Sequence, residues 1–439
     1  MGEPNAVNDI IERVIVEEGL VIYDGAVAQM VFTLLGNSDD LMLAQTPIDI
    51  YWKGNLNQLS NLRAGFAGDH FVYDPQHPQA VASDLQAQGE RGFIFRVINA
   101  NGQYNTSDPL DGKTQIEGFP TWPTVHWEEW KPVAGENAWV AMAAIQLYYK
   151  KYAQRGGVID YLPSAVELQL AEELARAALM LQADHGGIRM APIGTYAPAA
   201  SGTLEDVEKA QRWWYEQIST ENNISWYAAF RMLREVTGKD IYQQAMDNIE
   251  NYLKTVWNPQ ENYFYQGMHL MNGQWEVNAD HFALDVQTWG IAALSPVKID
   301  AWFGEGAAYR MWQKALDLSG ARGEDNRVRG VGFTQEHDRV SVEWTAGAVL
   351  AANELASYYT SSHPQWARDT SRVAQDLRAG IEELRSEISQ DMAAYSYSSH
   401  RGEIPFGWNS HFPEILSLAS TGWVLFIDNG INPFYLPLN

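Results

Sequence analysis

One buried helix decides the fold expected of this chain, and its sequence reads VEWTAGAVLAANELASYY over residues 342–359. Apolar or small residues occupy nearly every side of this helix, and Ala346, Gly347 and Ala351 would let neighbouring helices approach closely. A helix that is apolar nearly all round must be covered by neighbours on every side. The segment therefore predicts an inner helix of a larger helical assembly.

Six segments share this character, each with acids, amides or hydroxyls in its first turn. They span residues 23–36, 136–152, 223–238, 284–295, 342–359 and 418–429. Amphipathic segments, each charged on one side, lie between them. The clear amphipathic segments are 164–183, 239–257 and 365–388, and weaker ones cover 5–17, 39–50 and 304–318. Six inner helices alternating with amphipathic partners predict an all-α fold, the (α/α)6 toroid, a double ring of six inner and six outer helices.

Two stretches interrupt the helical pattern. Residues 53–132 contain a strand-like run at 91–97 followed by Asn101-Gly102, and we interpret them as a small β-containing insertion at the rim of the toroid. Residues 263–276 resemble a hairpin with its turn at Asn272-Gly273. Nothing resembles a flexible linker, so we expect residues 1–439 to form one domain.

Composition excludes several classes of function. The 439 residues carry 30 basic and 55 acidic side chains, a net charge of −25 that disfavours nucleic-acid and anionic-membrane partners. Absence of cysteine removes disulfides, thiolate nucleophiles and cysteine metal sites. No apolar run is long enough to cross a bilayer, so we expect a soluble protein. The chain begins Met1-Gly2-Glu3-Pro4, so either there is no signal peptide or the sequence starts after one, and a secreted or periplasmic location stays open.

The first turns of the inner helices should gather at one end of a central cavity, where ligands usually bind. The candidate side chains there are Tyr23, Asp24, Glu136, Asn137, Trp139, Glu221, Asn222, Trp226, Asp285, Trp289, Glu343, Trp344 and Trp423. Taken singly, an acid at a helix start caps the helix, and a tryptophan packs in the core. Acids and indoles recurring together favour a binding site.

This combination suits carbohydrate. Sugar rings present apolar C–H faces to aromatic rings, and their hydroxyls need amide and carboxylate partners. Cleavage of a glycosidic bond needs two carboxyl groups, one held protonated and one ionised. The negative charge of the chain is compatible with a neutral or weakly charged glycan.

Four helix starts carry a family resemblance. They read GENAW (135–139), STENNI (219–224), DVQTW (285–289) and VEWTAG (342–347). With the helical alternation, they resemble the (α/α)6-toroid carbohydrate-active enzymes over residues 21–434, excepting the insertion. Those families include hydrolases, lyases and sugar epimerases, so the resemblance implies the fold and a sugar substrate. It transfers no catalytic residue, because this chain lacks a diagnostic motif such as an adjacent aspartate pair at an inner-helix start.

Position along the chain therefore selects the acid–base pair. We expect Glu343 and Asp285 to form it, because they begin sequential inner helices that each carry a tryptophan. Val342 and Trp344 suggest the drier site for Glu343, which would be the general acid, whereas Asp285 would stay ionised. Glu136, Glu221 and Asp24 are alternatives.

Charged groups precede Glu343. His337 and Arg339 would orient substrate or a carboxylate, although a solvated charged loop is the favoured explanation of these residues. The histidines show no zinc-binding spacing, and no nucleotide-binding glycine loop occurs, so we expect neither a metal nor a cofactor.

Three functions remain open. The first is a glycoside hydrolase acting on an oligosaccharide or polysaccharide. The second is a lyase or epimerase using Tyr23, Tyr309, His281 or His337 for proton transfer. The third is a noncatalytic glycan-binding protein. Sugar identity, linkage, stereochemical course, endo or exo mode and oligomeric state stay undetermined.

Overall fold

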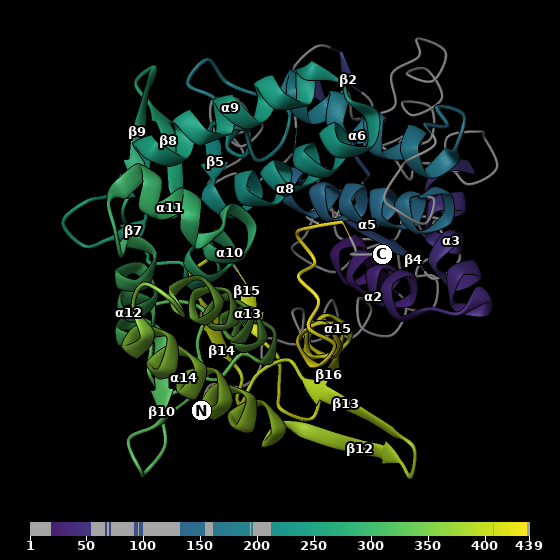
Figure 1. The fold of residues 1–439 in the computed structure, drawn as a ribbon. Helices are drawn as coiled ribbons and strands as arrows, with labels where there is room; N and C mark the ends of the chain where they lie inside the picture. Colours follow the sequence, from purple (N-terminus) through teal and green to yellow (C-terminus); the bar gives the residue numbers. More distant parts are fainter. Residues whose placement is uncertain are drawn as a thin grey trace, which may run out of the picture. The chain divides into compact units, whose positions relative to one another are not determined.

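The computed structural model describes residues 19–53, 66–67, 70–71, 92–94, 96–99, 132–153, 161–193, 195, 212–406 and 408–436. The chain divides into two compact units (Figure 1). The first unit consists of Met1–Ile218, Met232–Tyr242 and Leu438–Asn439, and the second of Ser219–Arg231 and Gln243–Pro437. The single domain expected above stays a prediction.

The first unit contains two inner-type and two amphipathic helices. These are α2 (Ile22–Leu35), α3 (Ser38–Lys53), α5 (Ala134–Tyr152) and α6 (Val166–Met180). Helix α5 packs against α2 and α6, and nearly all of its residues from Ala134 to Tyr149 are buried. Strand β1 (Gly19–Val21) pairs with β4 (Val97–Asn99), and β2 (Phe66–Ala67) pairs with β3 (His70–Phe71). Strand β5 (Gln217–Ser219) ends at Ser219, the first residue of the second unit.

The second unit is built around four buried helices. They are α8 (Thr220–Thr237), whose residues from Met232 onward belong to the first unit, α10 (Leu284–Leu294), α13 (Val342–Tyr359) and α15 (Leu418–Asp428). Helices α9 (Asp240–Thr255), α11 (Pro296–Phe303), α12 (Ala307–Ser319) and α14 (Pro364–Glu382) alternate with them along the chain. Helices α10, α14 and α15 all pack against α13 (Figure 1).

Small residues let the inner helices approach closely, as expected. A Cβ added at Gly347 of α13 would lie 3.0 Å from the indole Nε1 of Trp289 on α10. That spacing is tighter than nine in ten real Cβ contacts, so a larger residue at Gly347 would require the indole of Trp289 to shift by a few tenths of an ångström.

Short strands connect the helices of the second unit. Strand β6 (Trp257–Asn258) pairs with β7 (Tyr263–Phe264), β8 (Gly267–Met271) with β9 (Gln274–Asn278), and β10 (Gly320–Arg322) with β11 (Val328–Val331). Strand β12 (Arg385–Ser389) pairs with β13 (Met392–Ser396), which also pairs with β16 (Leu416–Ser417). The hairpin β14 (Gly402–Ile404) and β15 (Trp408–Ser410) completes the set.

The six apolar segments all form helices, and the predicted alternation with amphipathic helices is confirmed among the described residues. The predicted hairpin is confirmed too: Met271 faces Gln274 across Asn272 and Gly273, whose φ angles of 52° and 78° suit a tight turn. In the insertion, the last residue of the strand-like run is the first residue of β4, and Asn101-Gly102 lies outside the described residues. The amphipathic segment predicted at 5–17 lies outside the described residues as well.

One prediction of helix extent was wrong, and one helix was not predicted. The helix expected over 365–388 ends at Glu382, and β12 follows it. Ile388 continued the apolar spacing, but its side chain is 53% exposed on that strand. Helix α11 was not predicted; it is a short helix that begins with Pro296 at its first position, where proline is favoured.

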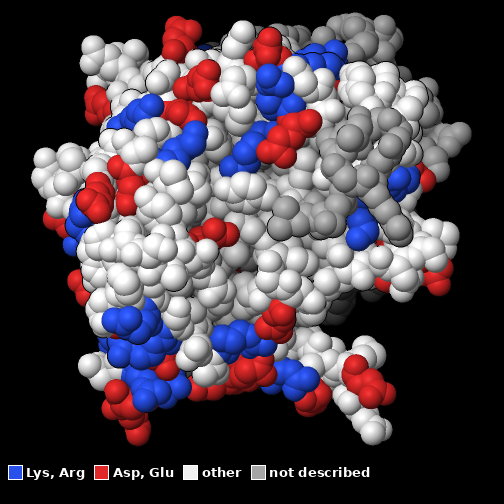
Figure 2. Space-filling model, in the orientation of Figure 1, with Lys and Arg blue, Asp and Glu red and all other residues white. Residues whose placement is uncertain are grey.

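The surface carries both signs of charge. On the face drawn in Figure 2, Lys and Arg side chains lie among Asp and Glu side chains. Arg378 illustrates this mixing, since its guanidinium contacts both Asp428 (2.8 Å) and Glu382. Of the helices that the structure describes, none combines the length and apolarity needed to span a bilayer.

Candidate active site

The starts of α8 and α10 are joined by the segment that follows α9. Thr220 donates its N–H to the Gln266 carbonyl (2.9 Å) and its hydroxyl to the Tyr265 carbonyl (2.8 Å). The Gln287 amide accepts from the N–H of Phe264 and donates to the carbonyl of the same residue, both at 2.9 Å. Consecutive residues of one segment therefore hold the first turns of two inner helices.

The starts of α10 and α13 are joined in the same way by the segment that follows α12. Leu284 donates its N–H to the Phe333 carbonyl (3.2 Å), and Ser341 donates to the Val331 carbonyl (2.9 Å). The Thr345 hydroxyl accepts from the Val331 N–H (3.0 Å).

A third segment joins α13 to α15. Val342 donates its N–H to the Tyr397 carbonyl (3.3 Å), and the Thr421 hydroxyl accepts from the Tyr395 N–H (3.1 Å). Together the three segments bring the first turns of α8, α10, α13 and α15 to the same end of the second unit, as the sequence predicted for these helices.

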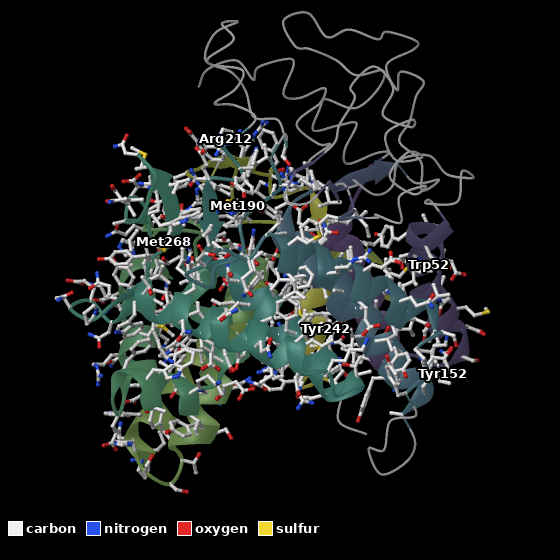
Figure 3. All side chains as sticks on the ribbon, turned by 90° about the horizontal axis from the view of Figure 1, so that it is seen from above. Trp52, Tyr152, Met190, Arg212, Tyr242 and Met268 are labelled. Atoms are coloured by element: carbon white, nitrogen blue, oxygen red, sulfur yellow. The ribbon has the colours of Figure 1, made fainter. Side chains whose placement is uncertain are left out.

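The first unit repeats this construction. The Asn137 amide accepts from the N–H of Ile94 (2.8 Å) and donates to its carbonyl (2.9 Å), while Ile22 donates to the Arg96 carbonyl (3.0 Å). Met190, labelled in Figure 3, accepts from the N–H of Ala134 (2.8 Å). A segment after each outer helix thus ties the inner helices at their starts.

Three carboxyl groups meet at this end of the second unit. Glu221, Asp285 and Glu343 are each the second residue of their helix, α8, α10 and α13. Asp285 is 8% exposed and Glu343 is 5% exposed, whereas Glu221 is half-buried and accepts a hydrogen bond from the Ser225 hydroxyl (2.9 Å). The predicted partners Asp285 and Glu343 are therefore neighbours, and Glu221, named as an alternative, joins them.

The electrostatics of the cluster act most strongly on Asp285. Burial raises the pKa of Asp285 well above its usual range, because the charged form loses contact with water. The negative charges of Glu221 and Glu343 raise this pKa further, and the Val286 N–H, which donates to Asp285 Oδ1 at 2.8 Å, opposes them. A carboxyl group in this setting retains its proton at a pH where an exposed aspartate is ionised.

The tryptophans of these inner helices serve mostly as packing. Trp226 and Trp423 have 0% exposure, so the core-packing alternative holds for these two rings, and we correct their expected contact with sugar. Trp289 stacks on Trp423 with centroids 5.4 Å apart and planes 13° apart, and Phe434 contacts both rings. Such aromatic packing gives the helix starts a rigid base.

Asn222 lies beside Glu221 in the first turn of α8. Its side chain is buried, and among the described residues its Nδ2 has no hydrogen-bond partner. A buried amide N–H group without a partner costs free energy, and a ligand hydroxyl could accept from it. The role of Asn222 in holding a ligand stays a prediction.

In the first unit, Glu136 pairs with Arg96 (2.9 Å), and Tyr23 packs edge-on against Trp139 at 5.1 Å. Asp24 is half-buried on α2. We correct the role of Asn137, which is fully buried and whose amide holds the backbone groups of Ile94 and Val133 rather than a sugar.

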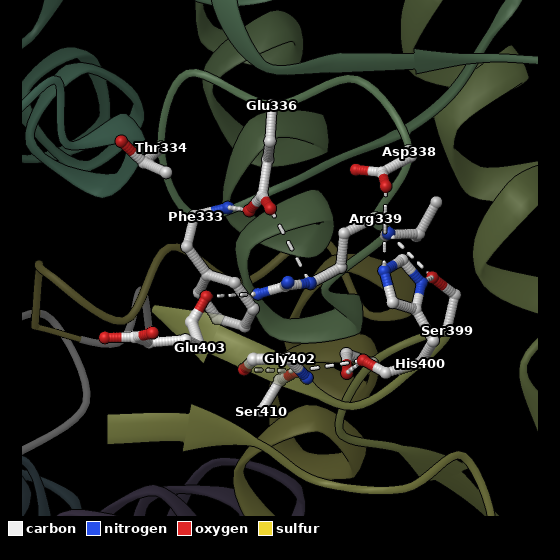
Figure 4. A network of polar contacts seen from close by, with 12 residues as sticks. Phe333, Thr334, Glu336, Asp338, Arg339, Ser399, His400, Gly402, Glu403 and Ser410 are labelled. Carbon is white, nitrogen blue, oxygen red and sulfur yellow. Dashed lines mark hydrogen bonds and ion pairs between the residues drawn. The ribbon is translucent and has the colours of Figure 1, made fainter. Parts of the chain in front are cut away.

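Arg339 also has a structural role rather than the expected contact with substrate. It is 7% exposed, and its guanidinium pairs with Glu336 (3.6 Å) and donates to the Glu403 carbonyl (3.3 Å), as Figure 4 shows. A Cβ at Gly402 would collide with this guanidinium. Arg339 therefore anchors the β14–β15 hairpin to the segment before α13. His337 is exposed, with its Nδ1 3.2 Å from the Gly320 carbonyl.

Tyr309, considered for lyase or epimerase chemistry, lies far from the carboxyl groups. It stacks on Trp366 at 4.6 Å and meets Tyr359, the last residue of α13, edge-on at 6.2 Å. Glu343 is at the opposite end of α13, about 24 Å away at the helical rise of ~1.5 Å per residue. Tyr309 was therefore a wrong candidate.

Sequence reasoning missed Phe406, in the turn of the β14–β15 hairpin. Its ring lies 6.3 Å from Trp344 and 6.3 Å from His281. The hairpin has no helical periodicity and only a weak strand pattern, so no sequence pattern places it beside α13. Among the described residues no group of three or more His, Asp or Glu side chains is arranged to hold a metal ion.

Comparison with known proteins supports the fold. No known protein family and no curated protein matches the sequence. Among solved structures, a sugar epimerase from a ruminal bacterium is 9% identical, with a TM-score of 0.55 over 94% of this chain and 88% of its own. Cellobiose 2-epimerases from Bacillus thermoamylovorans (10% identity, TM-score 0.53, 94% and 88% covered) and Spirochaeta thermophila (12%, 0.52, 94% and 87%) are similar. The chain thus has the predicted (α/α)6-toroid fold of carbohydrate-active enzymes.

Proposed function

We propose that this protein is a glycoside hydrolase that cleaves a neutral or weakly charged oligosaccharide or polysaccharide. The supporting observation is the cluster of Glu221, Asp285 and Glu343, contributed by the first turns of three successive inner helices. Hydrolysis of a glycosidic bond requires one protonated and one ionised carboxyl group, and we assign these two roles within this cluster.

Asp285 is the general acid in this proposal, which reverses the order expected from the sequence. Its burial and its two acidic neighbours favour the protonated form. Glu221 is the preferred ionised partner, because contact with water and the hydroxyl of Ser225 both favour a charged carboxylate. Glu343, the more buried of the two glutamates, completes the negative surroundings of Asp285.

The reaction follows from these roles. Asp285 gives its proton to the glycosidic oxygen while the bond from that oxygen to the anomeric carbon breaks. Glu221 either takes a proton from the water that attacks the anomeric carbon or attacks that carbon itself before water releases the sugar. The configuration of the released sugar distinguishes the two courses.

A sugar epimerase is the second candidate. It is favoured by the names of the similar structures, three of which are epimerases. His281, exposed and four residues ahead of Asp285, would then transfer the proton. Epimerisation leaves the chain length of an oligosaccharide unchanged, whereas hydrolysis shortens it.

The test is product analysis on a panel of neutral oligosaccharides. We expect the unaltered protein to release shorter sugars, and D285N to lower turnover about a hundredfold to ten-thousandfold while retaining binding. E221Q and E343Q should rank the two possible partners, the larger loss marking the ionised one. Binding without any product from the unaltered protein would support a noncatalytic glycan-binding protein instead.

A further inference from the structure

The turn of the β14–β15 hairpin places an aromatic ring close to the carboxyl cluster. Phe406 lies 6.3 Å from Trp344, with ring planes 22° apart, and meets His281 at 6.3 Å with planes 82° apart. Trp344 follows Glu343 directly, and His281 is four residues ahead of Asp285. Phe406 thus contacts the immediate surroundings of two of the three carboxyl groups.

Phe406 is only half-buried, so part of this residue meets water. By contrast, Trp344 is 5% exposed and packs edge-on against Phe333 at 4.9 Å, deeper in the unit. Trp344 therefore supports Phe406 from the protein side. A half-exposed aromatic ring backed by a buried one can accept the apolar face of another ring.

The hairpin that carries Phe406 is fixed by polar contacts to its surroundings (Figure 4). Arg339 donates to the Glu403 carbonyl (3.3 Å), and Val340 donates its N–H to the Ser399 hydroxyl (3.0 Å). The Ser410 hydroxyl accepts from the Gly402 N–H (2.9 Å) and donates to the His400 carbonyl (2.9 Å). These contacts hold Phe406 in place before any ligand arrives, which lowers the entropic cost of binding.

We propose that Phe406 and Trp344 form an aromatic subsite for one pyranose ring, next to the bond cleaved at Asp285. The C–H face of the sugar packs on Phe406, and the sugar hydroxyls remain at the rim of the ring. This inference rests on the proposed function for the identity of the ligand as a glycan, but it requires only that the site binds sugar.

Calorimetric titration of the full chain tests the subsite. The probes are neutral tri- to pentasaccharides of glucose and of mannose, titrated into D285N so that no turnover intervenes. We expect F406A to weaken the binding of the best of these probes about tenfold, and F406Y to stay within about twofold, because the aromatic face is kept. F406L retains apolar bulk without the ring and should bind as weakly as F406A.

The matched control is F412A, which removes a ring that is 46% exposed and covered by Arg401 at 4.7 Å. Affinity of F412A should equal that of D285N alone. Equal affinity of F406A and F412A, or failure of every probe to bind, would overturn the subsite.

Its failure is separable from failure of the hydrolase assignment. Phe406-dependent binding without cleavage by the unaltered protein would leave the subsite standing and remove the hydrolase. Cleavage by the unaltered protein with a KM that F406A does not change would support the hydrolase and remove the subsite.

Discussion

Gln287 and Phe264 are joined by a reciprocal pair of hydrogen bonds, in which one side-chain amide satisfies both backbone polar groups of a buried residue. Gln287 lies two residues after Asp285, and the residues after Phe264 bind Thr220, which precedes Glu221. The contact therefore sets the distance between the two carboxyl groups that we assign to proton transfer.

Removing this amide should destabilise the fold. In Q287L the N–H and the carbonyl of Phe264 lose their partner, and we expect the free energy of unfolding to fall by about 2 to 4 kcal/mol. Urea unfolding followed by circular dichroism measures it. Q243L is the control, because Gln243 is exposed and bonds only Asp247 (2.8 Å), so its effect should stay below about 0.5 kcal/mol. Equal stability of the two variants would show that the reciprocal pair contributes nothing.

The raised pKa of Asp285 makes stability depend on pH. In the unfolded chain Asp285 ionises at a pH near 4, whereas in the folded protein its raised pKa keeps it protonated to higher pH. As the pH rises from the unfolded pKa to the folded pKa, ionisation of Asp285 therefore favours the unfolded state. D285N removes this effect, and we expect it to be more stable than the unaltered protein at pH 7. The difference should vanish as the pH falls to about 4. Unfolding curves at both pH values test the sign, and a variant less stable at pH 7 would contradict it.

The pH at which activity falls on the alkaline side should depend on the charge of Glu221. The rate of hydrolysis falls as Asp285 loses its proton, and the charge of Glu221 raises the pKa of Asp285. E221D keeps that charge, whereas E221Q removes it, so the alkaline limb of the residual activity of E221Q should move to lower pH. E276Q, on an exposed position of β9, should leave the profile unchanged. An unshifted limb in E221Q would separate Glu221 from the acid.

Loss of the Arg339 anchor should affect binding more than chemistry. R339M removes the contacts to Glu336 and to the Glu403 carbonyl, which frees the hairpin that carries Phe406. We expect KM to rise about fivefold to tenfold while kcat stays within about twofold, because Arg339 touches no reacting atom. R322M, at an exposed position of β10, is the control. A fall in kcat with unchanged KM would place Arg339 in the reaction itself.

The fold was largely predictable from the sequence because its inner helices are apolar on every side. A further signal was overlooked: the fourth residue of most inner helices is polar, and Asn137, Gln287, Thr345 and Thr421 all bind the backbone of a connecting segment. The carboxyl cluster was predictable because Glu221, Asp285 and Glu343 share one position in their helices.

The rest depended on packing that no local pattern encodes. Trp226 and Trp423 were indistinguishable in sequence from ligand-binding rings, and burial alone assigned them to the core. The order of acid and partner was inferred from sequence neighbours, whereas the order that we propose rests on the charges that Glu221 of α8 and Glu343 of α13 place around Asp285. Phe406 lies on a hairpin about 60 residues after the start of α13. Its position beside α13 could therefore not be inferred from the spacing of residues in the sequence.

Mass spectrometry of the products formed in water enriched with oxygen-18 tests the central claim most directly. The account predicts that the unaltered protein shortens a neutral oligosaccharide and places one heavy oxygen in each released pair of fragments, and that D285N forms this product about a hundredfold to ten-thousandfold more slowly. An oligosaccharide recovered at full length, or cleavage that persists at the same rate in D285N, would contradict it.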